Sequence, residues 1–104
     1  MNLLMLYIPC PTEDVAENIL GSLLESKIIA CGNVIQSKSM YWWNGDISRE
    51  DEWIAIVKSL PDLYKVIEIH VKSIHPYDIP AILRWEVDAN QEYVDWVNDQ
   101  VVVV

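Results

Sequence analysis

The sequence predicts a single α+β domain in which an antiparallel sheet carries helices on one face. Apolar residues recur at strand spacing in four segments and at helical spacing in three, in the order β-α-β-β-α-β-α. The dipeptide Asn44-Gly45 predicts a tight hairpin between the second and third strands, because a type I′ turn needs positive φ at both central residues. A length of 104 residues suits one domain spanning 1–104.

The first strand and helix are predicted from an apolar run and the polar signals that follow it. Asn2–Pro9 is short, apolar and ended by prolines, as expected of a buried strand. Thr12 is a suitable N-cap with acidic residues in the first turn, so a helix is expected from about Thr12 to Ser26. Strand composition returns over Ile28–Val34.

The hairpin is predicted to be long. A two-residue turn at Asn44-Gly45 pairs Trp43 with Asp46, and the same count sets the polar stretch Gln36–Ser39 opposite Glu50–Trp53. Both strands are therefore polar at the same distance from the turn, so we expect a bend or bulge there and a projecting tip. A register slip is the competing account.

The second half repeats the pattern. Pro61 is well placed in the first turn of a second helix that must end before Pro76. A fourth strand is expected over Ile82–Val87, Asn90 can cap a last helix, and Val101–Val104 could add a short strand. The apolar stripe of the second helix consists of Leu63, Ile67, Val71 and Ile74.

Two split βαβ units with right-handed crossovers predict a ferredoxin-like βαββαβ fold with an extra C-terminal helix. Both main helices then lie on one face of the sheet. Adjacent residues of a strand point to opposite faces, so Trp42 and Trp43 need cover on both. Five tryptophans and five tyrosines are many for one small core, which predicts a partner subunit on the open face and around the hairpin tip.

The composition argues against several classes of function. The net charge is −9, with 7 Lys+Arg against 16 Asp+Glu, which predicts no nucleic-acid partner and no anionic membrane partner. The sequence contains neither a glycine-rich phosphate loop nor HExxH, so we expect no enzyme activity. The N-terminal segment has no basic region or cleavage site, so we expect a cytoplasmic protein with reduced thiols.

Five segments together resemble a known family: KIIACGNV, SMYWWNGDI, IVKS, IHPYDIPAIL and NQEYVDWV. In this order, and over roughly Met5 to Val97, they resemble the CutA family of divalent-cation tolerance proteins. The resemblance implies a homotrimer with Tyr41, Trp42 and Trp43 at the interface. It also implies binding of copper or another divalent cation that folding does not require. The family is similar in architecture to trimeric PII signalling proteins, which bind small ligands between subunits.

Three residues are candidate metal ligands. The resemblance implies His75, and imidazole suits copper, zinc and nickel; alternatively, His75 caps the end of the second helix. Cys31 is retained mainly on the resemblance, because a free cysteine in a strand is usually a small buried apolar residue. The topology sets Cys10 at the same end as His75, where a copper site could use both. Cys31 should lie at the opposite end, so no Cys10–Cys31 disulfide is expected.

Two cations are candidates for a different function. Lys58 and Arg84 could contact a small anionic ligand in an intersubunit cleft, although for Lys58 a salt bridge to a neighbouring carboxylate is favoured. His70 is expected at the edge of the core. The acidic run Glu50–Glu52 is expected to be solvated or to pair with Lys38 across the hairpin. A third possibility is a trimeric scaffold without a ligand.

Overall fold

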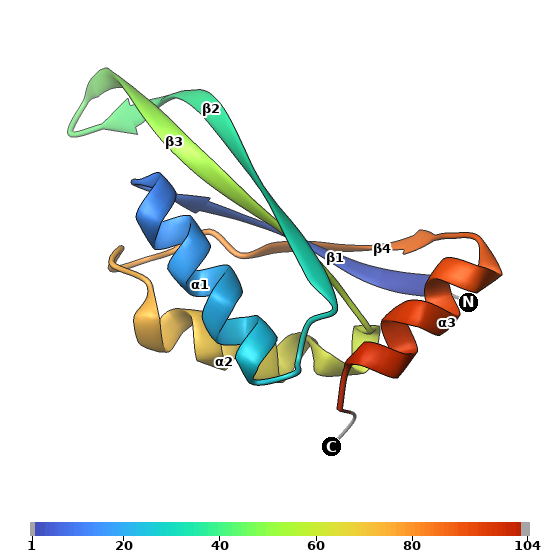
Figure 1. Cartoon of the computed structure of the whole chain (residues 1–104). Coiled ribbons are helices and arrows are strands. Elements are labelled where there is room, and N and C mark those ends of the chain that lie inside the picture. Colours follow the sequence, from blue (N-terminus) through green and yellow to red (C-terminus); the bar gives the residue numbers. More distant parts are fainter. Residues whose placement is uncertain (1, 103–104) are drawn as a thin grey trace.

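A computed structural model describes residues 2–102, and its elements follow the predicted order (Figure 1). The elements are β1 (Asn2–Cys10), α1 (Glu13–Glu25), β2 (Cys31–Trp43), β3 (Asp46–Ser59), a single 3-10 turn η1 (Pro61–Leu63), α2 (Tyr64–Ile74), β4 (Leu83–Asp88) and α3 (Gln91–Gln100). The predicted α+β class is confirmed.

The four strands form one antiparallel sheet in the order β2-β3-β1-β4. Figure 1 shows α1 and α2 side by side on one face of this sheet, and α3 at the end where β4 finishes. The core fills the space between the sheet and the two helices. Its fully buried members include Leu4, Leu6 and Ile8 of β1, Ile19 and Leu23 of α1, and Ile67 and Val71 of α2.

The start of α1 and the end of α2 follow the sequence signals, whereas Pro61, predicted in the first turn of the second helix, lies in η1, directly before α2 begins at Tyr64. The Thr12 hydroxyl accepts a hydrogen bond from the Val15 N–H at 3.1 Å and so caps α1. After α1, the predicted strand Ile28–Val34 begins only at Cys31. Ile28 and the next two residues are instead a buried connection, because the Ile28 carbonyl accepts the Ser59 hydroxyl at 2.6 Å.

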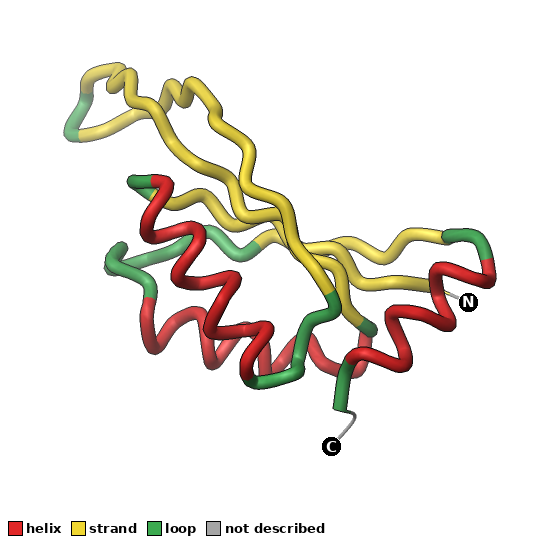
Figure 2. The backbone as a smooth tube through the Cα atoms, in the orientation of Figure 1, coloured by secondary structure: helices red, strands yellow, loops and turns green. Residues whose placement is uncertain are grey.

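The hairpin register is as predicted, but it contains no bulge. Pairing runs without interruption from Cys31–Lys58 to Trp43–Asp46, so the expected bulge and the register slip are both wrong. Figure 2 shows the two strands bending together as they run past the helices toward the tip. The hairpin therefore has the expected bend and projecting tip without a bulge. At the turn, φ is +51° for Asn44 and +83° for Gly45.

The face of the sheet turned away from α1 and α2 is called the open face. Directly paired residues of antiparallel strands share a face and successive residues alternate, so the register defines its members. They include Leu83 and Trp85 of β4, Met5 and Tyr7 of β1, Ile54, Ile56 and Lys58 of β3, and Cys31, Asn33 and Ile35 of β2. Leu3 and Val87 form a further pair on this face, but both belong to the packed core. Ile35, Leu83 and Trp85 leave large apolar areas exposed on this face.

The C-terminal segment is held against the turn that follows α1. Val101 is buried, and the Val102 N–H donates to the Lys27 carbonyl at 2.9 Å. Neither valine lies in a strand, and the rest of the predicted strand, Val103 and Val104, lies outside the described residues. None of the helices between residues 2 and 102 has the length and apolar character to cross a membrane.

Candidate functional site

His75 lies directly after α2 and binds the end of β1. The Tyr77 N–H donates to His75 Nδ1 at 3.1 Å, so Nδ1 is the unprotonated nitrogen. Nε2 therefore carries the proton and donates to the Pro9 carbonyl at 2.9 Å. The residue is buried, and both ring nitrogens are engaged. A metal at His75 would have to displace one of these two partners.

Cys10 lies at the same end of the subunit, next to the carbonyl that His75 binds. Its side chain is fully buried, and its Sγ lies 3.5 Å from the Ile8 carbonyl. Burial raises the pKa of Cys10 to about 11, and the negative charge of Glu52 adds to this. The thiol is therefore protonated at neutral pH, and copper binding here would release a proton.

Cys31 lies far from this end. It pairs with Lys58 on β3, whereas Pro9, the partner of His75, pairs with Ile54 four residues away along that strand. Both cysteines are free thiols, as predicted. The Cys31 Sγ lies 3.2 Å from the Tyr93 hydroxyl. This hydrogen bond, together with burial, raises the pKa of Tyr93 to about 12.

The structure places Lys58 and Arg84 on opposite faces of the sheet, because their partners on β1 are adjacent residues. Lys58 Nζ donates to Asn33 Oδ1 at 3.1 Å. The predicted salt bridge of Lys58 is wrong: between residues 2 and 102 its only polar partner is this neutral amide. The guanidinium of Arg84 lies 3.9 Å from the centre of the Tyr64 ring, in a cation–π contact.

Two further predictions, the pairing of Lys38 across the hairpin and the position of His70 at the edge of the core, are confirmed. Lys38 lies 4.0 Å from Asp51 across the hairpin, and both side chains are exposed. His70 lies at the edge of the core, where its Nε2 is 2.6 Å from the Ser22 hydroxyl and so connects α2 to α1. A contact of this kind between two helices leaves no trace in local sequence.

Tyr41, Trp42 and Trp43 lie at the hairpin tip and are uncovered in the single chain. Trp42 is 74% exposed and Trp43 64% exposed. Their side chains alternate between the two faces of the strand, as the register requires. The tip is therefore an apolar surface that this subunit does not bury itself.

The sequence did not predict the hydrogen bond between the loop after α2 and the hairpin. The Tyr77 hydroxyl donates to Glu52 Oε2 at 2.8 Å, and its ring lies against that of His75, with centroids 4.8 Å apart. Burial is the main cause that raises the pKa of Tyr77. His75 and Tyr77 thus join the end of β1 to the middle of β3. The HPY tripeptide indicated a turn but not this partner.

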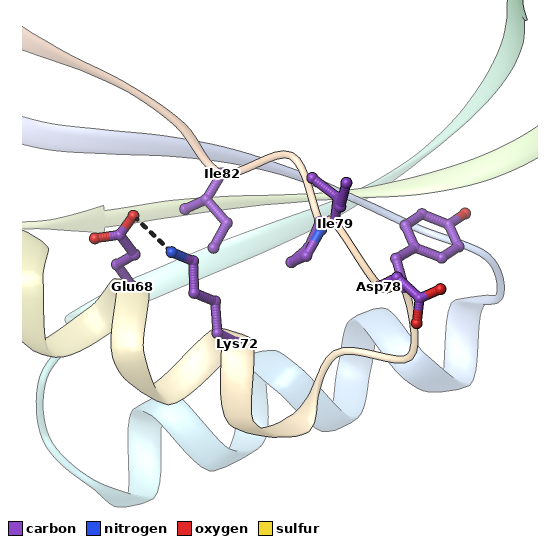
Figure 3. A pocket seen from close by; sticks show the side chains of 7 residues that line it. Glu68, Lys72, Asp78, Ile79 and Ile82 are labelled. Carbon is purple, nitrogen blue, oxygen red and sulfur yellow. Dashed lines mark ion pairs between the residues drawn. The ribbon is translucent and has the colours of Figure 1, made fainter.

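A cavity lies between α2 and the loop that leads to β4 (Figure 3). Its volume is about 490 Å³. Glu68 and Lys72 form an ion pair of 3.3 Å at one end, and Figure 3 shows Ile82 next to this pair and Ile79 farther toward Asp78. Of the predicted site residues, none lines this cavity. Across residues 2–102, no three His, Cys, Asp or Glu side chains are grouped closely enough to hold a metal ion.

Comparison with known proteins identifies a family. Residues 4–100 match the sequence profile described as CutA1 divalent ion tolerance protein. The divalent-cation tolerance protein CutA of Pyrococcus horikoshii is 35% identical over 99 residues, which cover 94% of this chain and 97% of that protein. The same-named protein of Thermotoga maritima is 35% identical over 100 residues, covering 95% and 99%.

Solved structures give the same result. The crystal structure of the divalent ion tolerance protein CutA1 from Ehrlichia chaffeensis superimposes with a TM-score of 0.94 at 36% identity, over 98% of this chain and 97% of that one. The crystal structure of CutA1 from Pyrococcus horikoshii gives a TM-score of 0.93 at 35% identity, over 96% of this chain and 99% of that one.

Proposed function

This chain belongs to the CutA1 divalent ion tolerance family, and from that premise we propose that it is a homotrimeric, copper-binding protein of metal tolerance. The subunit is then a ferredoxin-like unit, which the strand order β2-β3-β1-β4 supports. Copper is cargo rather than a structural component. The protein acts by binding and not by catalysis, and we place it in the cytoplasm, where its free thiols stay reduced.

The observation that supports the copper site best is that Cys10 and His75 both lie at the same end of β1. His75 donates to the carbonyl of Pro9, the residue before Cys10. A thiolate and an imidazole are a ligand pair that copper prefers. Glu52 precedes Trp53, the residue that pairs with Cys10, and its carboxylate accepts the Tyr77 hydroxyl. Cys31 lies apart from this group and would bind a metal separately.

The proposed trimer rests on apolar surface that one subunit leaves exposed. Trp42 and Trp43 at the tip, together with Leu83 and Trp85 of the open face, are large apolar side chains that stay exposed in the single subunit, as is typical of an interaction surface. A ring of three copies in head-to-tail contact covers two different surfaces of each subunit, which is what a tip and an open face require.

Calorimetric titration of the purified oligomer with copper(II) tests the copper site. The wild type should bind stoichiometrically, and His75→Ala should bind at least tenfold more weakly because an imidazole ligand is lost. His70→Ala is the matched control, since the chain contains only two histidines. If His75→Ala and the wild type bind alike, or neither binds specifically, the His75 site is wrong, and a scaffold without a ligand becomes the better account.

A second candidate function is a PII-like signalling module that binds a small anionic ligand between subunits. It is favoured by Lys58, whose only polar partner within residues 2–102 is a neutral amide. Arg84 is the other candidate contact. Because the two cations point to opposite faces of one sheet, a shared ligand would have to take Lys58 from one subunit and Arg84 from another.

A further inference from the structure

Lys58 lies in the middle of a row of side chains that crosses the whole sheet on the open face. Met5 pairs with Trp85 on one side and with Lys58 on the other, and Lys58 pairs with Cys31. Four side chains, one from each strand, therefore stand side by side. The row is apolar at one end and carries hydrogen-bond donors at the other.

Among the open-face residues named above, Lys58 is also the only one that carries a formal charge. The chain carries 16 Asp+Glu against 7 Lys+Arg, so a cation without a carboxylate beside it is unexpected. On the same face of β3 the first carboxylate is that of Glu52, six residues or about 20 Å away. Glu52 itself accepts the Tyr77 hydroxyl. The Lys58 ammonium thus has no counter-ion in its own surroundings on the sheet.

The groups around Lys58 are donors. The Asn33 carbonyl oxygen accepts from Lys58 Nζ at 3.1 Å, which leaves the two N–H groups of the same amide available. An ammonium has three N–H groups, so Lys58 also keeps donors free. The Tyr93 hydroxyl reaches the face from α3 and lies 3.2 Å from the Cys31 sulfur, where either atom can be the donor. An oxyanion is the ligand that such a set of donors recognises.

We infer that Lys58, Asn33 and Tyr93 bind a small oxyanion, a phosphate or carboxylate group, on the open face. This inference deepens the second candidate function and rests on the proposed trimer, in which the open face is covered. Covering the open face removes water from the Lys58 ammonium. A buried ammonium without an anion is strongly disfavoured, so Lys58 should take up a counter-ion when the trimer assembles. The apolar side chains of Met5 and Trp85 lower the local dielectric and strengthen the contact.

Titration of the assembled protein with inorganic phosphate at low ionic strength, followed by calorimetry, tests the site. The wild type should show saturable binding. Lys58→Met keeps the apolar stem and should bind at least tenfold more weakly, and Asn33→Ala and Tyr93→Phe should each lose severalfold. Lys38→Met is the matched control: this lysine is exposed on the hairpin, paired with Asp51, and its loss should leave phosphate binding unchanged.

Sedimentation velocity in the same buffer separates the possible failures. If the wild type is a trimer that binds no phosphate, the oxyanion site is wrong and the trimer is supported. The same holds if Lys38→Met weakens phosphate binding as much as Lys58→Met does. If Lys58→Met dissociates the trimer, the anion is a carboxylate of a neighbouring copy, and the inference is wrong. A wild type that sediments as a monomer overturns the trimer itself. A circular dichroism melt shows whether Lys58→Met is folded. Lys58→Gln is the second variant for the same test in case Lys58→Met does not fold.

Discussion

The two cysteines have the same side chain and opposite surroundings. Cys10 is sealed in the core, where a thiolate would be uncompensated, whereas Cys31 is half-buried and hydrogen-bonded to Tyr93. The pKa of Cys10 is accordingly raised from an ordinary 9.0 to about 11. Its chemistry is therefore controlled by proton release, and a metal that binds there must compete with a tightly held proton.

This shift predicts a pH-dependent stability. A group whose pKa is higher in the folded state stabilises the fold below its unfolded pKa, and the contribution is lost as the pH rises through the folded value. For Cys10 the loss falls between pH 9 and pH 11. Urea unfolding at pH 8 and pH 10.5 should give a fall in the free energy of unfolding that is on the order of 2 kcal/mol larger for wild type than for Cys10→Ala.

The two proteins share every other titrating group, including Tyr93, so the difference between their pH dependences isolates the one thiol. Parallel curves for wild type and Cys10→Ala would contradict the buried, protonated state of Cys10.

Residue partners were the hardest feature to predict from sequence. The local surroundings of His75 were predictable, because Pro76 forces the chain to turn directly after it. Its bond to Pro9 was not, since that contact spans 66 positions. For Lys58 the error was to expect a carboxylate from the overall charge. The register instead gives it Asn33, two residues along β2 from its paired residue, and neutral neighbours on the same face.

At the scale of elements, local turn chemistry fixed the hairpin register over its full length. A two-residue turn determines every pair behind it, and Asn44-Gly45 can adopt the required positive φ. The predicted bulge is wrong because a polar stretch in both strands has two explanations, a bulge or a part of the hairpin that extends beyond the helices without one. Only the positions of α1 and α2 distinguish them, and those depend on tertiary packing.

The contact between α1 and β2 is the tightest that a glycine makes in this fold. A Cβ at Gly32 would lie 2.5 Å from Leu20 Cδ2 and 3.0 Å from the Ile56 carbonyl oxygen. Gly32→Ala should therefore force α1 away from the sheet and destabilise the protein by about 1–3 kcal/mol. Thermal or urea unfolding of the variant measures this directly.

Gly21→Ala is the matched control within the same pair of elements. Nothing lies within 4 Å of a Cβ at Gly21, which is inside α1. Alanine in a helix interior should there stabilise by roughly 0.5–1 kcal/mol. Gly32→Ala should thus lower the free energy of unfolding, and Gly21→Ala should raise it. If Gly32→Ala were neutral, the packing of Leu20 against β2 would be looser than the structure indicates.

At the scale of the whole molecule, the subunit is elongated because of its hairpin. Its extents are 45, 25 and 20 Å, and Figure 1 shows the joined ends of β2 and β3 reaching past the helices. The class and element order followed from periodicity and turn signals, since these are local. The uncovered surfaces at the tip and on the open face could be predicted only as a surplus of aromatic residues.

The assembly should therefore depend on the tip tryptophans. Replacing Trp42 and Trp43 together by serine removes two large exposed side chains that lie outside the core, so each subunit should keep its circular dichroism spectrum. Burying one such side chain contributes on the order of 2–3 kcal/mol, and three copies supply six. The dissociation constant of the proposed trimer should then rise by several orders of magnitude, because each 1.4 kcal/mol is tenfold. Sedimentation velocity should detect subunits in place of trimers.

Ile79→Ser is the control, since Ile79 is 91% exposed but lies on the loop after α2, away from the tip. If the double variant sediments like the wild type, the tip does not hold the assembly, and the apolar open face with Leu83 and Trp85 must do so alone.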